Sequence, residues 1–102
     1  MRQLAAIDKV LRVYEKSGDC LYVRNNAKSE QGSFLDVGKI GKSDFLLFMP
    51  QGKALFLEVL TSKARQTDRQ RSYQVKAERL GYRYLVVRDV AEVVRLFNDR
   101  GS

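Results

Sequence analysis

Two short apolar runs joined by turn-forming residues constrain the fold of this chain more than any other feature. The first run covers residues 45–49 and the second covers residues 54–60, with Pro50, Gln51 and Gly52 between them. Proline and glycine are typical of tight turns, and the lengths of the two runs are those of strands. The segment therefore predicts a β-hairpin, in which the two strands are antiparallel neighbours.

Helices and further strands are predicted on both sides of this hairpin. Apolar residues recur every three or four positions near the N-terminus, which indicates one face of a helix that Gly18 ends. After the hairpin, Thr67 with Gln70 and Asp89 with Glu92 form two capping boxes that begin helices. The expected elements are a helix over 3–16, a strand within 19–25, the two hairpin strands, a helix that ends at Gly81, a strand over 82–88 and a terminal helix. The chain is thus expected to be an α/β protein with the order α-β-β-β-α-β-α.

Length and composition fit one globular domain. The chain has 102 residues, of which 44% are hydrophobic and 30% are charged, so it has room for one apolar core but not for two. We expect a single domain over residues 1–99 and a frayed tail at 100–102. Cys20 is the sole cysteine and histidine is absent, which excludes an internal disulfide and the usual zinc sites. No apolar run approaches the roughly 20 residues that span a bilayer, so no membrane contact and a cytoplasmic location are expected.

The net charge of the chain is strongly positive. Lysine and arginine number 19 against 12 acidic residues, which gives a formal charge of +7. Such an excess attracts the phosphate backbone of nucleic acids. It also keeps a small protein in solution, and charge alone does not separate these two interpretations.

Two carboxylates interrupt the apolar hairpin and form the candidate site. Asp44 stands where the first strand begins and Glu58 near the end of the second, so the hairpin places them almost opposite each other at its open end. Paired carboxylates with a free carbonyl nearby are what a hard cation such as Mg2+ or Mn2+ prefers, and Val59 is placed to supply that carbonyl. Alternatively, Asp44 is a loop residue and Glu58 faces solvent or pairs with a lysine, as acidic residues in sheets often do.

The residues around these carboxylates occur in a recognisable order. In sequence they are Gly38, Gly41, Ser43-Asp44, Leu57-Glu58-Val59, Gln70 and Gly81. This order resembles the VRR-NUC (virus-type replication-repair nuclease) family of the PD-(D/E)XK superfamily. The family's pattern is a glycine-rich loop, a (P/S)D pair, an apolar strand ending in E-x-K, and a helix carrying Q before a later G. The resemblance implies a PD-(D/E)XK restriction-endonuclease-like core, with a mixed central sheet flanked by helices.

The resemblance also implies an activity and the residues that carry it. Asp44, Glu58 and the backbone carbonyl of Val59 would bind Mg2+ or Mn2+, and Gln70 would lie beside this catalytic site. Alternatively, Gln70 caps the start of its helix, and the two roles can coexist. A cation in such a site polarises the scissile phosphate and activates the attacking water. By the same resemblance, the chain is a structure-selective DNA endonuclease domain that cleaves branched DNA such as four-way junctions. It would act as a homodimer in a bacterial or phage-infected cell.

Two positions depart from the family pattern. The lysine of the E-x-K motif is replaced by Leu60, which can neither orient the attacking water nor neutralise charge on the phosphate. Lys63 is a distant candidate to replace it. The family also tends to place a glutamate early in the first helix, where this chain has the neutral Gln3. We therefore expect impaired cleavage, and the alternative function is a non-catalytic nucleic-acid-binding module that keeps the nuclease fold.

Basic residues cluster around the proposed centre and are expected to contact the DNA backbone and shape rather than the bases. They are Lys39 and Lys42 before the hairpin and Lys63, Arg65, Arg69 and Arg71 after it. Each of them has the alternative of lying in solvent without a contact to DNA. A third interpretation, an interaction subunit with no nucleic-acid role, predicts no salt-dependent affinity for DNA.

Overall fold

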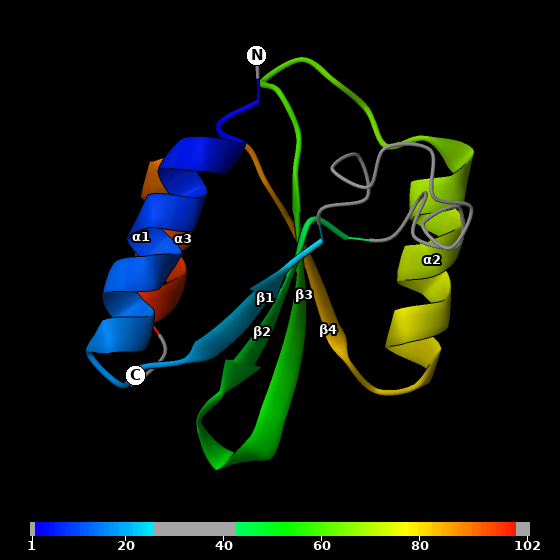
Figure 1. Cartoon of the computed structure of the whole chain (residues 1–102). Helices are drawn as coiled ribbons and strands as arrows, with labels where there is room; N and C mark the ends of the chain where they lie inside the picture. The colour runs from blue at the N-terminus through cyan, green and yellow to red at the C-terminus, as the bar shows by residue number, and fades with distance from the viewer. Residues whose placement is uncertain (1, 26–42, 100–102) are drawn as a thin grey trace, which may run out of the picture.

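The computed structural model describes residues 2–25 and 43–99, which form a four-stranded sheet between helices (Figure 1). The elements follow one another as α1 (Leu4–Lys16), β1 (Leu21–Arg24), β2 (Phe45–Met49), the 3-10 turn η3 (Pro50–Gly52), β3 (Lys53–Val59), α2 (Asp68–Arg79), β4 (Arg83–Val87) and α3 (Val90–Asp99). The predicted α/β class and order of elements are confirmed. Within the described ranges, no helix combines the length and the apolar character needed to cross a membrane. The predicted tail at 100–102 lies outside the described residues.

The strands are ordered β1-β2-β3-β4 across the sheet. The pairs β1–β2 and β2–β3 are antiparallel, whereas β3 and β4 are parallel and are connected through α2. The predicted hairpin consists of β2 and β3, and its turn places Gln51 and Gly52 at positive φ (68° and 71°). Glycine adopts this conformation without strain, which explains its presence in the turn. A parallel pair needs a long crossover connection, so α2 packs across one face of the sheet.

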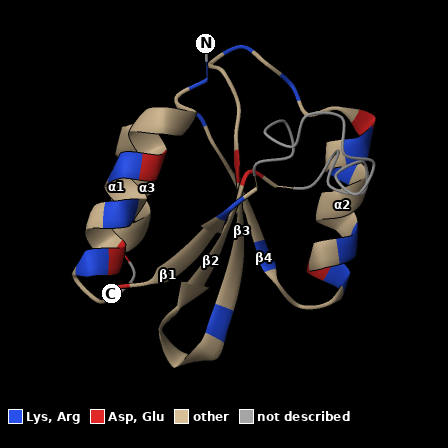
Figure 2. Ribbon diagram, in the orientation of Figure 1, with Lys and Arg blue, Asp and Glu red and all other residues tan. Residues whose placement is uncertain are grey.

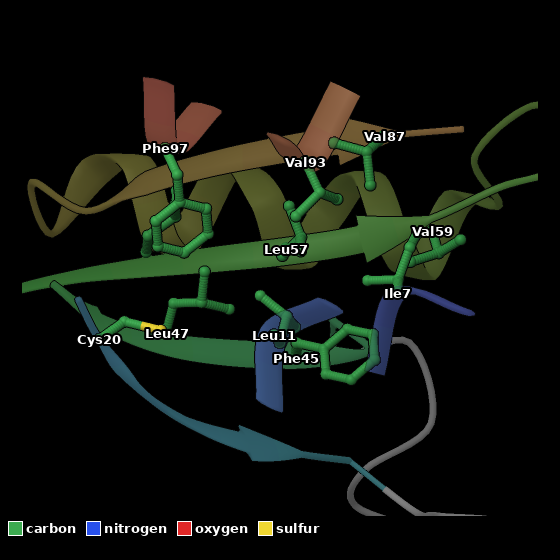
Figure 3. Close-up of a cluster of buried hydrophobic side chains, with 11 residues drawn as sticks. Ile7, Leu11, Cys20, Phe45, Leu47, Leu57, Val59, Val87, Val93 and Phe97 are labelled. Atoms are coloured by element: carbon green, nitrogen blue, oxygen red, sulfur yellow. The ribbon is translucent and has the colours of Figure 1, made fainter. Parts of the chain in front are cut away.

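The helices α1 and α3 lie together on one side of the sheet and cover the main apolar core (Figures 1 and 3). Alternate residues of β2 and β3 point into this core, as the two-residue period of a strand requires. Tyr14 of α1 stacks on Phe97 of α3 with ring centroids 3.9 Å apart. The buried core residues are Ile7, Leu11, Cys20, Phe45, Leu47, Leu55, Leu57, Val59, Val87, Val93 and Phe97. Each fully buried aliphatic side chain contributes roughly 1.5–3 kcal/mol, so this face anchors the sheet that carries the two carboxylates.

The opposite face of the sheet carries aromatic side chains and packs against α2. Phe56 of β3 lies beside Tyr84 of β4 in the strand register. Tyr73 of α2 packs edge-on against Phe56, with ring centroids 5.7 Å apart. Glu58 lies two residues beyond Phe56 on the same strand and therefore on the same face. This glutamate is thus buried on the α2 side of the sheet, away from the main apolar core.

Side chains that accept backbone N–H groups fix the starts of α2 and α3. Thr67 and Gln70 form the predicted capping box, with the Gln70 N–H donating to Thr67 Oγ1 (3.1 Å) and the Thr67 N–H to Gln70 Oε1 (2.7 Å). At α3, the Glu92 N–H donates to Asp89 Oδ1 (2.9 Å), as predicted. The Glu92 carboxylate accepts the N–H of Arg88 (2.6 Å), one residue earlier than a capping box requires. Of the second predicted capping box, the bond to Asp89 is therefore present, whereas Glu92 accepts from Arg88 instead of Asp89.

Candidate active site

The pairing of β2 with β3 brings Asp44 and Glu58 together at the open end of the hairpin. Phe45, the first residue of β2, pairs with Leu57 of β3, so the next positions outward are Asp44 and Glu58. Residues directly opposite each other in an antiparallel pair share a face and have Cβ atoms roughly 4.5–5.5 Å apart. Extended by one pair, the register therefore sets Asp44 opposite Glu58 on the α2 face, as expected from the sequence.

Asp44 is held by hydrogen bonds to both of its carboxylate oxygens. Its Oδ2 accepts the N–H of Val59 (2.7 Å), and its Oδ1 accepts the guanidinium of Arg2 (3.1 Å). The same guanidinium nitrogen donates to the carbonyl oxygen of Val59 at 3.4 Å. The Asp44 carboxylate and the Val59 carbonyl are thus both directed at one cationic group, which comes from the segment before α1.

Glu58 is completely buried, with 0% of its surface exposed. Its Oε1 accepts hydrogen bonds from the hydroxyl of Tyr84 and from the side-chain amide of Gln66 (3.3 Å). Its Oε2 has no donor among the residues that the structure describes. A buried polar atom without a partner costs about 1–3 kcal/mol, and more when it is charged. The free oxygen therefore marks a place where a bound ligand would be strongly stabilised.

Gln66 and Tyr84 position Glu58, and neither was predicted as a site residue. Gln66 Nε2 also donates to Gln74 Oε1 (2.9 Å), and Gln74 in turn donates to Glu78 (3.3 Å), so α2 holds the amide in place. Tyr84 reaches Glu58 from the neighbouring parallel strand, a pairing that only the complete topology reveals. Gln66 lies in the loop before α2, where no periodic pattern marks it.

The pKa of Tyr84 is raised, which keeps its hydroxyl a hydrogen-bond donor. Burial raises the pKa of Tyr84, and its hydrogen bond to Glu58 raises it further. The negative charges of Glu58 and Asp44 act in the same direction. The phenol therefore stays protonated at neutral pH and keeps donating to the glutamate.

The substitution Tyr84→Phe is expected to change how stability depends on pH. Because the pKa of Tyr84 is higher in the folded chain, its contribution is complete below about pH 10, the usual tyrosine pKa, and is lost as the pH rises above that value. The free energy of unfolding of the wild type should therefore fall more steeply above about pH 10 than that of the variant. At pH 7 the variant should be less stable by about 1–3 kcal/mol, since Glu58 loses a donor. Urea denaturation across this pH range measures both effects, with the exposed Tyr82→Phe as control, and parallel curves would contradict the assignment.

The oxygen donors at this end of the hairpin fit a hard divalent cation. Asp44 Oδ1, Glu58 Oε2 and the carbonyl oxygen of Val59 are ligands of the type that Mg2+ and Mn2+ prefer. In the described part of the chain, no three His, Cys, Asp or Glu side chains come together to hold a metal, so a cation here would rest on two carboxylates, a backbone oxygen and water. Mg2+ usually keeps several waters in this way. Gln3, where the family tends to have a glutamate, adds no carboxylate, and its side-chain oxygen accepts the N–H of Val90 (3.3 Å).

The two remaining residues predicted for catalysis are Gln70 and Leu60. The side-chain oxygen of Gln70 is engaged in the capping box, and the amide that contacts Glu58 belongs to Gln66. Leu60 is 6% exposed, and its N–H donates to the carbonyl of Val87 (3.0 Å), so the chain stays paired with β4 beyond the end of β3. In an extended chain, a side chain two residues beyond Glu58 lies on the same face. A buried apolar side chain thus occupies the lysine position of the motif, on the face that carries Glu58.

Basic residues lie on the segment between β3 and α2 and on α2 itself (Figure 2). Of those predicted to bind DNA, the exposed ones are Lys63, Arg65, Arg69 and Arg71. Lys39 and Lys42 lie outside the described residues. Arg88 fixes the segment by donating to the carbonyl oxygens of Thr61 and Ala64. The segment that contains Gln66, which contacts Glu58, therefore also carries positive charge next to the site.

Comparison with known proteins identifies a similar fold. No protein-family model matches the sequence, and no curated protein matches it significantly. The structure is similar to a solved chain described as a VRR_NUC domain, with a TM-score of 0.66 over 96% of this chain and 97% of that one. The two sequences are 17% identical, so the likeness is one of fold. This chain therefore has the fold of a VRR-NUC domain, as the resemblance in its sequence implied.

Proposed function

We propose that this chain is a metal-dependent, structure-selective DNA endonuclease domain that acts on branched DNA such as four-way junctions. We further propose that Leu60 slows its cleavage. The observation that carries the proposal is that the hairpin register sets Asp44 opposite Glu58 at its open end, where Asp44 and the Val59 carbonyl contact the same Arg2 nitrogen. One buried carboxylate oxygen there has no donor within the described ranges. The VRR-NUC fold of the chain supports the same conclusion.

The side chains around the site have separate tasks in phosphodiester hydrolysis. The three oxygen donors described above would hold Mg2+ or Mn2+, which when bound supplies the Lewis acidity that polarises a phosphate and acidifies the attacking water. Tyr84 and Gln66 keep Oε1 of Glu58 in place, which leaves Oε2 available as a ligand. Leu60 offers the phosphate neither a positive charge nor a proton donor, so the charge that develops during cleavage is less stabilised.

The charge of the chain supports the choice of substrate. The +7 net charge and the exposed basic residues beside the site favour contacts with phosphates, which are independent of base sequence. A homodimer would place two sites on two strands of a junction, and a two-fold dimer is the commonest way to achieve this. Action in the cytoplasm of a bacterial or phage-infected cell belongs to the same proposal.

The substitution Arg69→Ala is expected to weaken junction binding and to reduce its salt dependence. Loss of one phosphate contact should lower the slope of log affinity against log salt concentration by about 1. Arg79→Ala removes the same charge from the last turn of α2 and is the matched control. Fluorescence anisotropy at several salt concentrations measures the slopes. Identical slopes for the wild type and both variants would exclude Arg69 from the DNA contact.

Cleavage assays test the proposed function directly. The wild type is incubated with labelled four-way junctions and with linear duplexes in Mg2+ or Mn2+. We expect slow cleavage of the junction, which EDTA abolishes and Asp44→Asn reduces to background. Asp99→Asn, at the end of α3, is the matched control and should cleave like the wild type. Cleavage that persists in EDTA or in Asp44→Asn would contradict the proposal.

A non-catalytic nucleic-acid-binding module is the second candidate, and Leu60 is the observation that favours it. A buried leucine at the lysine position removes a catalytic charge, while the exposed basic residues that attract DNA remain. Junction binding without cleavage at any protein concentration, even after a lysine is introduced at position 60, would favour this function over the first.

A further inference from the structure

We infer that Arg2 is the resident cation of the candidate metal site, and that a divalent cation binds only by displacing the Arg2 guanidinium. The inference rests on the proposed function, because it concerns the same oxygen donors. It adds a competitor for the metal that neither the sequence motif nor the fold comparison assigns.

One guanidinium nitrogen occupies the place where a cation would contact two of the three donors. Arg2 Nη1 lies 3.1 Å from Asp44 Oδ1 and 3.4 Å from the carbonyl oxygen of Val59. A metal ion would have to approach the same two oxygens to about 2.0–2.1 Å in the case of Mg2+. Two positive groups cannot share this position, so binding of one excludes the other.

The contacts of Arg2 also leave the site open to competition. The hydrogen bond to Val59 is long, and such a distance makes it weak. The Arg2 side chain is 32% exposed, so it can turn toward solvent without crossing the core. Glu58 Oε2 has no donor in the part of the chain that the structure describes, and a metal ion between the carboxylates would gain this oxygen as a third ligand. A divalent cation would therefore contact three oxygen ligands, whereas Arg2 contacts two.

With competition of this kind, the apparent affinity for metal is the intrinsic affinity multiplied by the fraction of time that the site is free. If Arg2 occupies the site about nine-tenths of the time, the apparent dissociation constant is about tenfold above the intrinsic one. The chain would then need more Mg2+ or Mn2+ than its oxygen donors alone require.

Direct measurement of Mn2+ binding tests the inference without any cleavage assay. The signal of free Mn2+ in electron paramagnetic resonance is followed as the wild type or Arg2→Met is added. Methionine keeps an unbranched side chain but removes the guanidinium, and we expect it to lower the dissociation constant about tenfold. Arg12→Met is the matched control, because Arg12 pairs with Asp8 on α1 and is 58% exposed. Equal or weaker Mn2+ binding by Arg2→Met would overturn the inference.

Further variants separate failure of the inference from failure of the proposed function. Equal Mn2+ affinity in the wild type and Arg2→Met leaves the metal site intact and rejects the role of Arg2 alone. No Mn2+ binding by either chain rejects both the metal site and the inference. Adding Glu58→Gln to Arg2→Met should remove the binding, and binding that survives would place the metal elsewhere and overturn the inference. Arg2→Gln should repeat the gain, and circular dichroism checks that each variant is folded.

Discussion

The substitution Leu60→Lys is expected to raise the rate of junction cleavage by about a hundredfold or more over the wild type. The extended backbone past the end of β3 directs residue 60 to the face that carries Glu58. An ammonium group there would neutralise charge on the phosphate and orient the attacking water. Loss of one such positioned donor commonly costs about 100- to 1000-fold in rate, so its return should recover a gain of that order.

The gain in cleavage rate requires that a charged lysine be tolerated at the buried position 60. A lysine at a position that is 6% exposed loses hydration, which is costly unless a negative group lies close by. Asp44 and Glu58 lie on the same face and supply that compensation. Leu60→Met is the matched control, because it keeps a similar volume without charge and should give no gain. Single-turnover rates with excess protein measure the effect. Absence of cleavage by all three chains, with unchanged DNA binding, would favour the binding module.

The elements of the fold could be predicted because their signals are local. The hairpin follows from two apolar runs and the turn at 50–52, which are adjacent in the sequence. The start of α2 follows from Thr67 and Gln70, three residues apart, and the structure has that capping box. The same locality made the opposition of Asp44 and Glu58 predictable, since only the position of the turn fixes their register.

The groups that surround the two carboxylates could not be predicted because they come from distant parts of the chain. Arg2 and Val59 are 57 positions apart, and Tyr84 and Glu58 are 26 apart. Their contacts depend on where α1 begins and on which strand pairs with β3, and no short pattern encodes either. The sequence therefore indicates which acidic residues are candidates for the site, whereas the structure shows the Arg2 guanidinium and the hydrogen-bond donors that contact them.

The substitution Glu58→Gln is expected to stabilise the metal-free chain while abolishing its affinity for Mn2+. Glu58 is fully buried, and its Oε2 has no donor within 2–25 and 43–99. A neutral amide of the same shape keeps an oxygen that accepts from Tyr84 and Gln66. Its NH2 group takes the place of Oε2 without a partner, but an unpaired neutral group costs less than an unpaired buried charge. We expect a gain of about 2 kcal/mol in the free energy of unfolding, which raises the melting temperature by about 8–16 °C.

The matched control for this prediction is Glu15→Gln. Glu15 is half-buried and accepts the N–H of Tyr22 (3.1 Å), so loss of its charge should change stability by less than about 0.5 kcal/mol. Calorimetry in EDTA measures the gain, and added Mn2+ should then raise the melting temperature of the wild type but not of Glu58→Gln. A lower melting temperature for Glu58→Gln in EDTA would mean that its hydrogen bonds outweigh the cost of burial. Residues retained for activity often reduce the stability of a fold. We expect the buried carboxylate of Glu58 to reduce the stability of this chain when no cation is bound.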